Sequence, residues 1–190
     1  KKKDSKIKIL MATRLLRAKG IYDFVNAAKA IKPKFSHVNF YLAGEPDSGN
    51  PSSIDSKEFH QWKNDDYIEI LGHVNSVENL LAKMDIVALP SQYGEGVPRI
   101  LVEAAACGLP LVATDVPGCR EIVFDGKTGL LVPPGDLSSL IDALEKLIKD
   151  AEFRRTCGEQ SRLHCEENYS SNVVNNKTMQ VYESLNMNRS

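Results

Sequence analysis

The sequence has no long apolar run and little net charge. No apolar stretch approaches the roughly 18 residues that a membrane-spanning helix needs, and no signal peptide precedes the first predicted strand. The formal net charge of the 190 residues is −1, so there is no global attraction to nucleic acid or to anionic membranes. We expect a cytoplasmic protein with no nucleic-acid partner and no transmembrane segment.

Paired cysteines and metal-ligand spacing are also absent. The four cysteines form no C-x-x-C pair, and they are Cys107, Cys119, Cys157 and Cys165. We predict reduced thiols, with Cys107 buried in an apolar helix. The four histidines are scattered and are better read as structural than as ligands. The sequence therefore predicts no metal site.

The composition that is present suits one soluble domain. Hydrophobic residues make up 42% of the chain and charged residues 26%, which is ordinary for a globular protein with a full core. No internal repeat and no linker divides the sequence. We predict a single domain over residues 1–190.

Apolar patterning alternates between short strand-like runs and helical periods. The predicted strands cover 6–12, 37–43, 67–71, 85–89, 110–114 and 129–132. The predicted helices cover 19–32, 57–64, 76–84, 98–107, 118–124, 137–149, 153–168 and 172–185, with Ser76 as a cap. This order predicts an α/β fold: a Rossmann-like, doubly wound parallel sheet of about six strands with helices on both faces.

Ligands of such sheets bind outside the carboxyl ends of the strands. That rule selects the loops at 13–19, 44–51, 72–76, 90–98 and 115–120. In the first loop, Arg14 and Lys19 could neutralise a diphosphate, because Arg offers a fork of donors and Lys a point charge. Ordinary surface charge is the alternative reading of both residues.

The loop PSQYGEGVPR precedes the helix predicted over 98–107. Gly94 and Gly96 would let a ligand approach the backbone, and Pro98 suits the first helical turn. The free N–H groups at this helix start form an anion site, supplied by Val97, Arg99 and Ile100. The same phosphate could be reached by Arg14 and Lys19.

Two glutamates flank that predicted anion site. Glu103 lies about 7.5 Å along the helix, where it could accept hydrogen bonds from a diol such as ribose. A solvated carboxylate is the alternative, although the apolar neighbours of Glu103 favour a specific partner. Glu95, before the helix, would face the other side of the phosphates.

The segment Gly126-Lys127-Thr128 imitates the end of a phosphate loop. A phosphate loop requires a glycine five residues before Gly126, but the residue at that position is Glu121. We therefore predict a turn leading into a strand, and not a nucleoside triphosphatase.

These elements together resemble a known family. The resemblance runs through ATRLLRAKGIYDFVNAAKAI, FYLAGEP and ILGHVNSVENLLAKMDIVALPS, and ends with EGVPRILVEAAACGLPLVATDVPGCREIVFDGKTGLLVPPGD. The chain is similar to the C-terminal, nucleotide-sugar-binding domain of the family-4 retaining glycosyltransferases of the GT-B fold. The last segment carries their E-x7-E motif. Its EGVPR variant is similar to enzymes that build capsule, O-antigen and related surface glycans.

The resemblance implies a role for each candidate residue. Arg14 and Lys19 would bind the donor diphosphate and stabilise the leaving group, Glu95 would contact the donor sugar, and these are the expected catalytic residues. The resemblance further implies that Glu103 binds the ribose hydroxyls and that the backbone around His73 and Val74 lines the base pocket. The phosphate-binding N–H groups would come from the helix start, made by Gly96, Val97, Pro98, Arg99, Ile100 and Leu101.

The resemblance also implies partners and limits. The donor would be a nucleotide sugar, with UDP favoured over GDP, and neither a cofactor nor a bound metal is expected, since no D-x-D motif is present. The acceptor, a glycan or lipid-linked sugar, would bind to an N-terminal domain that this chain lacks. The isolated domain would then be inactive, and peripheral membrane association of the full-length enzyme stays open. A non-catalytic binding subunit and a GT-B nucleotide-sugar epimerase remain as alternatives.

Overall fold

The computed structural model describes residues 6–47, 49–94 and 96–187. A six-stranded sheet forms its centre, and every strand pair in it is parallel. The strands are β1 (Ile7–Ala12), β2 (Val38–Ala43), β3 (Glu69–Gly72), β4 (Ile86–Leu89), β5 (Leu111–Thr114) and β6 (Gly129–Val132). The predicted fold class is confirmed.

The strand order of the sheet is β3-β2-β1-β4-β5-β6. The chain thus builds outward from β1 in one direction, then returns and builds outward from β4 in the other. The crevice between the loops that follow β1 and β4 is the topological switch point, where sheets of this order bind nucleotides. The predicted anion-binding residues come from these two loops.

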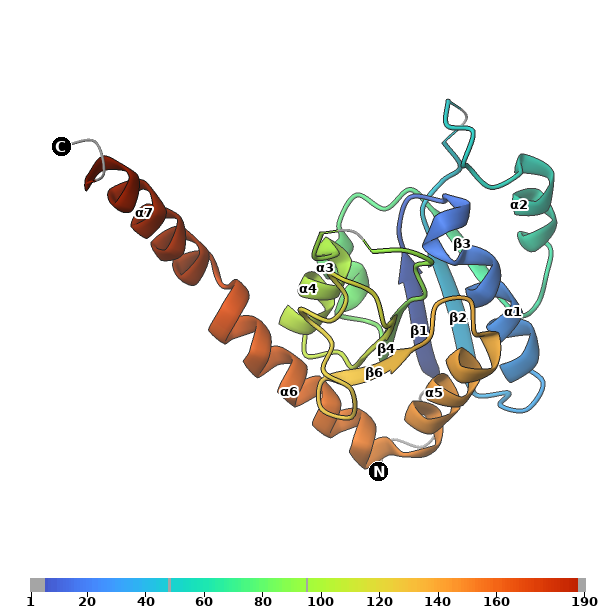
Figure 1. Cartoon of the computed structure of the whole chain (residues 1–190). Helices are drawn as coiled ribbons and strands as arrows, with labels where there is room; N and C mark the ends of the chain where they lie inside the picture. The colour runs from blue at the N-terminus through green and yellow to red at the C-terminus, as the bar shows by residue number, and fades with distance from the viewer. Residues whose placement is uncertain (1–5, 48, 95, 188–190) are drawn as a thin grey trace.

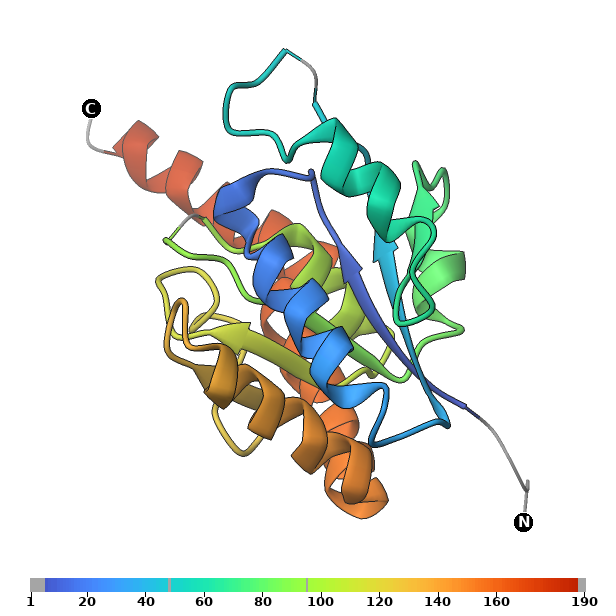
Figure 2. The ribbon, with the colours of Figure 1, turned by 90° about the vertical axis from the view of Figure 1, so that its right-hand side faces the viewer.

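Helices cover both faces of the sheet (Figures 1 and 2). One face carries α1 (Ile21–Ile31), α2 (Ser56–Trp62) and α5 (Leu137–Lys149), and the other α3 (Val77–Leu81), α4 (Arg99–Ala106) and α6 (Ala151–Tyr169). A short 3₁₀ helix, η1 (Arg17–Lys19), precedes α1. The strands read as nearly continuous apolar runs because both of their faces are buried.

The last helix, α7 (Ser171–Met187), follows α6 and projects away from the sheet (Figure 1). Large apolar side chains stay exposed along it, namely Val174, Met179, Val181 and Tyr182. A helix of this length gains most of its stability from packing against other elements. Its exposed apolar residues therefore mark a surface that this chain alone does not cover.

Several predicted boundaries were wrong for local reasons. The helix expected over 19–32 begins only at Ile21, because Gly20 takes a left-handed conformation with φ of 74° between η1 and α1. The helix expected over 76–84 spans only Val77–Leu81, and the Ser76 side chain bonds to Glu78 instead of capping a backbone amide. Helix α6 begins at Ala151, earlier than expected, because the Asp150 side chain caps it by accepting from the Phe153 amide.

The helix expected over 118–124 is replaced by turns. The buried Thr128 hydroxyl accepts from the Phe124 amide and donates to the Ile122 carbonyl. These bonds take up backbone groups that a helix would have used. Gly126 and Thr128 thus belong to a turn that feeds β6, as predicted for the segment that imitates a phosphate loop.

The cysteine prediction was right about state and wrong about one location. None of the four cysteines, all of which the structure describes, forms a disulfide bond. Cys107 is exposed, whereas Cys119, Cys157 and Cys165 are buried. Burial raises the pKa of the Cys157 and Cys165 thiols. In the part of the chain that the structure describes, no helix has both the length and the apolar character to cross a membrane.

Candidate functional site

A close backbone contact brings the loop after β1 against the loop after β4. A Cβ atom placed on Gly20 would lie 1.8 Å from the Pro90 carbonyl oxygen, so only glycine fits there. Beside this contact, the Gln92 amide donates to the Ala18 carbonyl at 2.8 Å. Lys19 is thereby held next to the PSQYGEGVPR loop, some 70 residues away in sequence.

The ends of β1, β2 and β3 come together around a second glycine, Gly44. Gly44 has a φ of 135°, and a Cβ on it would lie 2.1 Å from the Thr13 carbonyl oxygen. The Thr13 amide donates to Ala43 at 3.1 Å, and the Gly44 amide donates to Gly72 at 2.8 Å. The carboxyl ends of these three strands consequently meet around one space.

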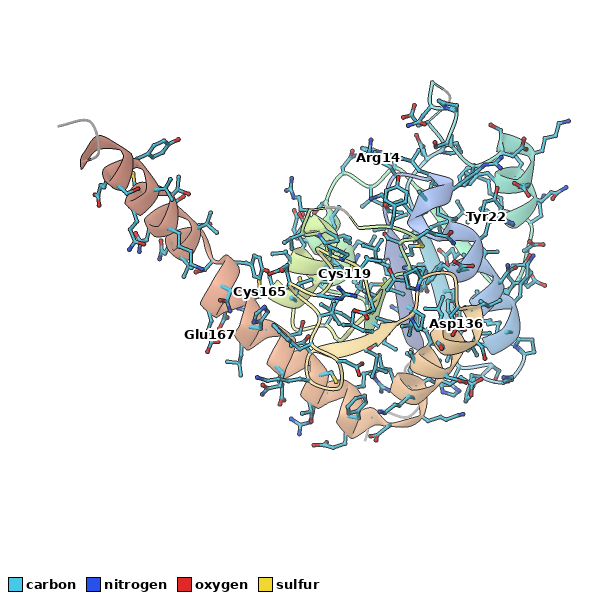
Figure 3. The ribbon with its side chains drawn as sticks, in the orientation of Figure 1. Arg14, Tyr22, Cys119, Asp136, Cys165 and Glu167 are labelled. Atoms are coloured by element: carbon cyan, nitrogen blue, oxygen red, sulfur yellow. The ribbon has the colours of Figure 1, made fainter. Side chains whose placement is uncertain are left out.

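That space is an open cavity of about 610 Å³. It is lined from the ends of β1, β2 and β3 and from α3 and α4 by Ala12, Thr13, Arg14, Ala43, Gly44, Glu45, His73, Val74, Asn75, Val77, Glu78, Arg99, Ile100 and Glu103. Figure 3 shows Arg14 at this end of the sheet. The cavity combines an apolar wall with two arginines, which is the mixture expected for a ligand that has both an organic and an anionic part.

The structure brings many of the predicted binding residues into this one cavity: Arg14, His73, Val74, Arg99, Ile100 and Glu103. The other predicted residues that are described do not line it, and they are Lys19, Gly96, Val97, Pro98 and Leu101. Glu95 lies outside the described residues. The predicted sugar contact thus has no structural description, while the predicted ribose and base contacts and part of the predicted phosphate contacts line one space.

The start of α4 is the predicted anion site, and two of its residues have no free N–H group. Pro98 is the N-cap, is buried and has no N–H group, and no side chain caps the helix. The Leu101 amide donates to the Pro98 carbonyl at 3.0 Å, and the Leu101 side chain is fully buried. The Leu101 N–H group is thus already bonded within the first turn, whereas Arg99 and Ile100 are the helical residues of the predicted phosphate-binding set that line the cavity.

Glu103 points from the second turn of α4 toward the cavity. Its side chain is 32% exposed, and its Oε1 accepts a hydrogen bond from Nε of Arg99 at 2.7 Å. A carboxylate has about four acceptor positions, so most of the acceptor capacity of Glu103 remains for a ligand. Diol binding and simple solvation are both compatible with this geometry.

Two acidic residues of the cavity lining are not among the predicted site residues. Glu45 follows Gly44 at the end of β2, and its Oε1 accepts from the His73 amide at 3.4 Å. Glu78 lies in the first turn of α3, where a hydrogen bond from Ser76 lowers its pKa. Glu45 falls within a loop that the carboxyl-end rule had selected, but nothing in its neighbours indicated which side chain would face inward.

The loop after β5 does not line the cavity, although the carboxyl-end rule selected it too. There Arg120 donates from Nε to Asp115, and this hydrogen bond lowers the pKa of the Asp115 carboxyl group. Pro117 in the same loop lies against the glycine turn that precedes α4, within 3.0 Å of a Cβ placed on Gly94. This loop buttresses the turn from outside.

Comparison with known sequences identifies the chain. Residues 1–164 match the sequence model of the family described as glycosyl transferases group 1. The chain belongs to this family. The match covers every strand of the sheet and all the residues that line the cavity.

Curated relatives include glycosyltransferases of bacterial polysaccharide synthesis. The chain is 27% identical over 172 residues to the capsular polysaccharide biosynthesis glycosyltransferase CapM of Staphylococcus aureus, covering 90% of this chain and 44% of the relative. It is 31% identical over 180 residues to an N,N'-diacetylbacillosaminyl-diphospho-undecaprenol alpha-1,3-N-acetylgalactosaminyltransferase of Campylobacter jejuni, covering 95% of this chain and 45% of the relative. The chain thus spans less than half the length of these two relatives.

Solved structures repeat this pattern. Anabaena Alr3699/HepE, determined in complex with UDP, superposes with a TM-score of 0.84 at 25% identity, over 95% of this chain and 49% of that one. It has also been solved in complex with UDP-glucose. The C-terminal domain of a glycosyl transferase group 1 family protein (LpcC) from Francisella tularensis superposes with a TM-score of 0.77 at 24% identity, over 88% of both chains. These neighbours establish the fold as that of one GT-B domain.

Proposed function

We propose that this chain is the donor-binding domain of a retaining glycosyltransferase. It would bind a nucleoside-diphosphate sugar, with UDP-sugar favoured, for transfer to an acceptor hydroxyl in the synthesis of a surface polysaccharide or glycan. The observation that carries the proposal is the single cavity at the switch point of the sheet, into which Arg14, the uncapped start of α4 and Glu103 converge. The complexes of Alr3699/HepE with UDP and UDP-glucose support the choice of donor.

Each part of the donor has a complementary part of the cavity. The diphosphate lies at the start of α4, where free amides and the helix dipole favour negative charge, and Arg14 faces it across the cavity. The ribose hydroxyls donate to Glu103, and the base lies on the wall made by His73 and Val74. The sugar extends toward the turn that contains Glu95.

Transfer would proceed with retention of anomeric configuration. The bond between the anomeric carbon and the β-phosphate oxygen breaks with its electron pair left on the nucleoside diphosphate. The acceptor oxygen bonds to the anomeric carbon from the same face and releases its proton. Arg14 and Lys19 accelerate the step because they bind the leaving diphosphate more strongly as its charge grows. The proposed mechanism has no role for a metal ion, and among the described residues no cluster of three His, Cys, Asp or Glu is arranged to hold one.

The acceptor would bind to a second, N-terminal domain of the same enzyme. The chain spans less than half the length of its curated relatives, which leaves room for such a domain. The exposed apolar residues of α7 offer a surface on which another domain could pack. We propose that this chain binds donor alone and transfers sugar only when joined to that partner.

A thermal-shift panel of nucleotide sugars tests the donor assignment. UDP-sugars should raise the melting temperature of the chain more than GDP-sugars do, because a ligand that binds only the folded state stabilises it. The absence of any shift with every nucleoside diphosphate would contradict the proposal. Conversion of a UDP-sugar into its epimer by the chain alone would favour the epimerase alternative.

Joining the chain to its N-terminal half tests the enzymatic assignment. The joined protein should transfer sugar with retained configuration, observable as the anomeric coupling constant of the product by NMR. Binding of donor without transfer by the joined protein would indicate a non-catalytic binding subunit.

A further inference from the structure

Arg99 occupies a position that helix stability does not favour. It is the first residue of α4, at the positive end of the helix dipole, where a cation is destabilising. No acidic residue lies in this first turn to compensate. Helix stability therefore does not account for an arginine at this position.

The ion pair of Arg99 does not supply that reason either. The Arg99 side chain is 91% exposed, and its partner Glu103 follows it by four residues on the same helix. Exposed helical pairs of this spacing contribute little to stability, and least when the cation precedes the carboxylate, as here. The pair therefore has little value for folding.

The cavity that Arg99 lines holds more carboxylates than guanidinium groups. Three carboxylates line the cavity, those of Glu45, Glu78 and Glu103, against two guanidinium groups, those of Arg14 and Arg99. A nucleoside diphosphate brings several further negative charges into the same space. A ribose-binding carboxylate beside a diphosphate would repel it unless a cation were held close to that carboxylate.

Building on the proposed donor site, we propose that Arg99 is a positioning residue for Glu103. Its guanidinium orients the Glu103 carboxylate toward the ribose diol and offsets the charge of that carboxylate, so that diol and diphosphate can bind together. Arg99 thus selects ligands that carry both groups. The Arg99 side chain acts through Glu103 and need not touch the phosphate.

This role predicts a difference between two probes. Loss of the Arg99 charge should weaken binding of UDP much more than binding of uridine, because only UDP places phosphates near the exposed charge of Glu103. Because charges a few ångströms apart interact more strongly at a protein surface than in bulk water, a loss of about tenfold is expected for UDP. The difference should shrink as salt is added, because salt screens exposed charges.

The test uses calorimetric titration of the 190-residue chain with UDP and with uridine. Arg99→Met should weaken UDP binding about tenfold and uridine binding less than about threefold, and Arg99→Lys should recover most of the UDP affinity. Arg120→Met is the matched control, because Arg120 also pairs through Nε with a carboxylate at this edge of the sheet but does not line the cavity. The control should bind both probes as the unchanged chain does.

A double-mutant cycle then tests whether Arg99 acts through Glu103. With Glu103→Gln already present, Arg99→Met should cost less than about threefold in UDP affinity, because the carboxylate charge is gone. An equal cost in both backgrounds would overturn the proposal, since Arg99 would then act on the ligand directly. Equal losses for UDP and uridine in the single variant would also overturn it.

The titrations distinguish failure of the proposed role of Arg99 from failure of the proposed donor site. If the unchanged chain binds neither UDP nor a UDP-sugar, the donor site itself is refuted. If it binds UDP and Arg99→Met leaves that affinity unchanged, only the role of Arg99 is refuted.

Discussion

A helical glutamate lies at each end of the parallel strands, at the amino edge and at the carboxyl edge of the sheet, and the two have different surroundings. At the amino edge, Glu145 of α5 is only 12% exposed and binds two lysines, Lys34 at 2.7 Å and Lys149 at 2.5 Å. At the carboxyl edge, Glu103 of α4 is 32% exposed, binds Arg99 of its own helix, and lines a cavity. The first carboxylate is satisfied within the fold, whereas the second keeps acceptor positions open. The difference separates a charge used for stability from a charge available to a ligand.

The largest expected effect concerns how the carboxyl edge is held together. Gly20→Ala should lower the free energy of unfolding by about 3 kcal/mol, because the new Cβ would combine a left-handed conformation with a clash against Pro90. Gly135→Ala is the control: Gly135 has the same φ of 74°, but nothing lies within 4 Å of its Cβ position. That variant should lose only about 1 kcal/mol, the cost of the conformation alone.

Urea denaturation of the two variants measures this difference. Equal losses for Gly20→Ala and Gly135→Ala would mean that the contact between the loops after β1 and β4 does not hold the site. The predicted neighbourhood of Lys19 and the start of α4 would then fail with it.

The next effect concerns charge at the carboxyl edge. Arg14→Ala or Lys19→Ala should weaken UDP binding at least tenfold, about 1.4 kcal/mol or more, through loss of a charge-assisted contact. Stability should change little for Arg14→Ala, because Arg14 is exposed. Arg17→Ala is the control, since Arg17 is an exposed cation of the same loop to which no contact with the diphosphate is assigned.

Isothermal titration calorimetry gives these affinities. Unchanged UDP affinity in both Arg14→Ala and Lys19→Ala would remove the diphosphate from this loop. A loss in Arg17→Ala as large as in Arg14→Ala would indicate a general effect of surface charge.

A smaller effect is expected at the amino edge and should show in stability alone. Hydrogen bonds from Lys149 and Lys34 lower the pKa of Glu145 in the folded protein. Its ionised form therefore adds stability above the pKa of the unfolded chain, and that stability is lost as the pH falls through the lowered folded value. Glu145→Gln should cost up to about 1 kcal/mol at pH 7.

Denaturation curves from pH 7 to pH 3 test the sign of this effect. The two proteins should converge in stability at the acid end, and UDP affinity at pH 7 should be the same in both. A stability difference that grows toward low pH would contradict the account of Glu145.

Removal of metal ions is expected to have no effect on UDP binding. Because Arg14 and Lys19 are assigned the neutralisation of the diphosphate, removal of divalent cations with EDTA should leave UDP affinity unchanged. A fall in affinity that added Mg²⁺ restores would show that a metal ion shares this work.

The fold could be read from the sequence because its signals are local. Both the strands and α5 follow from apolar periodicity and flanking Gly, Pro and Asp residues, and α5 begins and ends where predicted. The site loops followed from the carboxyl-end rule once the sheet was known to be parallel. Local periodicity therefore led to the end of the strands at which the cavity lies.

Part of what could not be predicted depends on contacts between distant residues. Gly20 lies against the Pro90 carbonyl, and Glu45 accepts from the His73 amide at the end of β3. Other differences have local causes: the Thr128 hydroxyl bonds to the backbone of Phe124 and Ile122, and the Leu101 amide bonds to the Pro98 carbonyl. Apolar periodicity does not show which hydroxyl or amide makes such a bond.

The most direct measurement of the central claim is the position of UDP in crystals of this chain. The account predicts diphosphate oxygens at the amides of Arg99 and Ile100 and at the Arg14 guanidinium, with the ribose hydroxyls on Glu103. UDP bound instead in the cavity of about 350 Å³ near Lys32 and Tyr67, or a diphosphate far from the start of α4, would contradict the account.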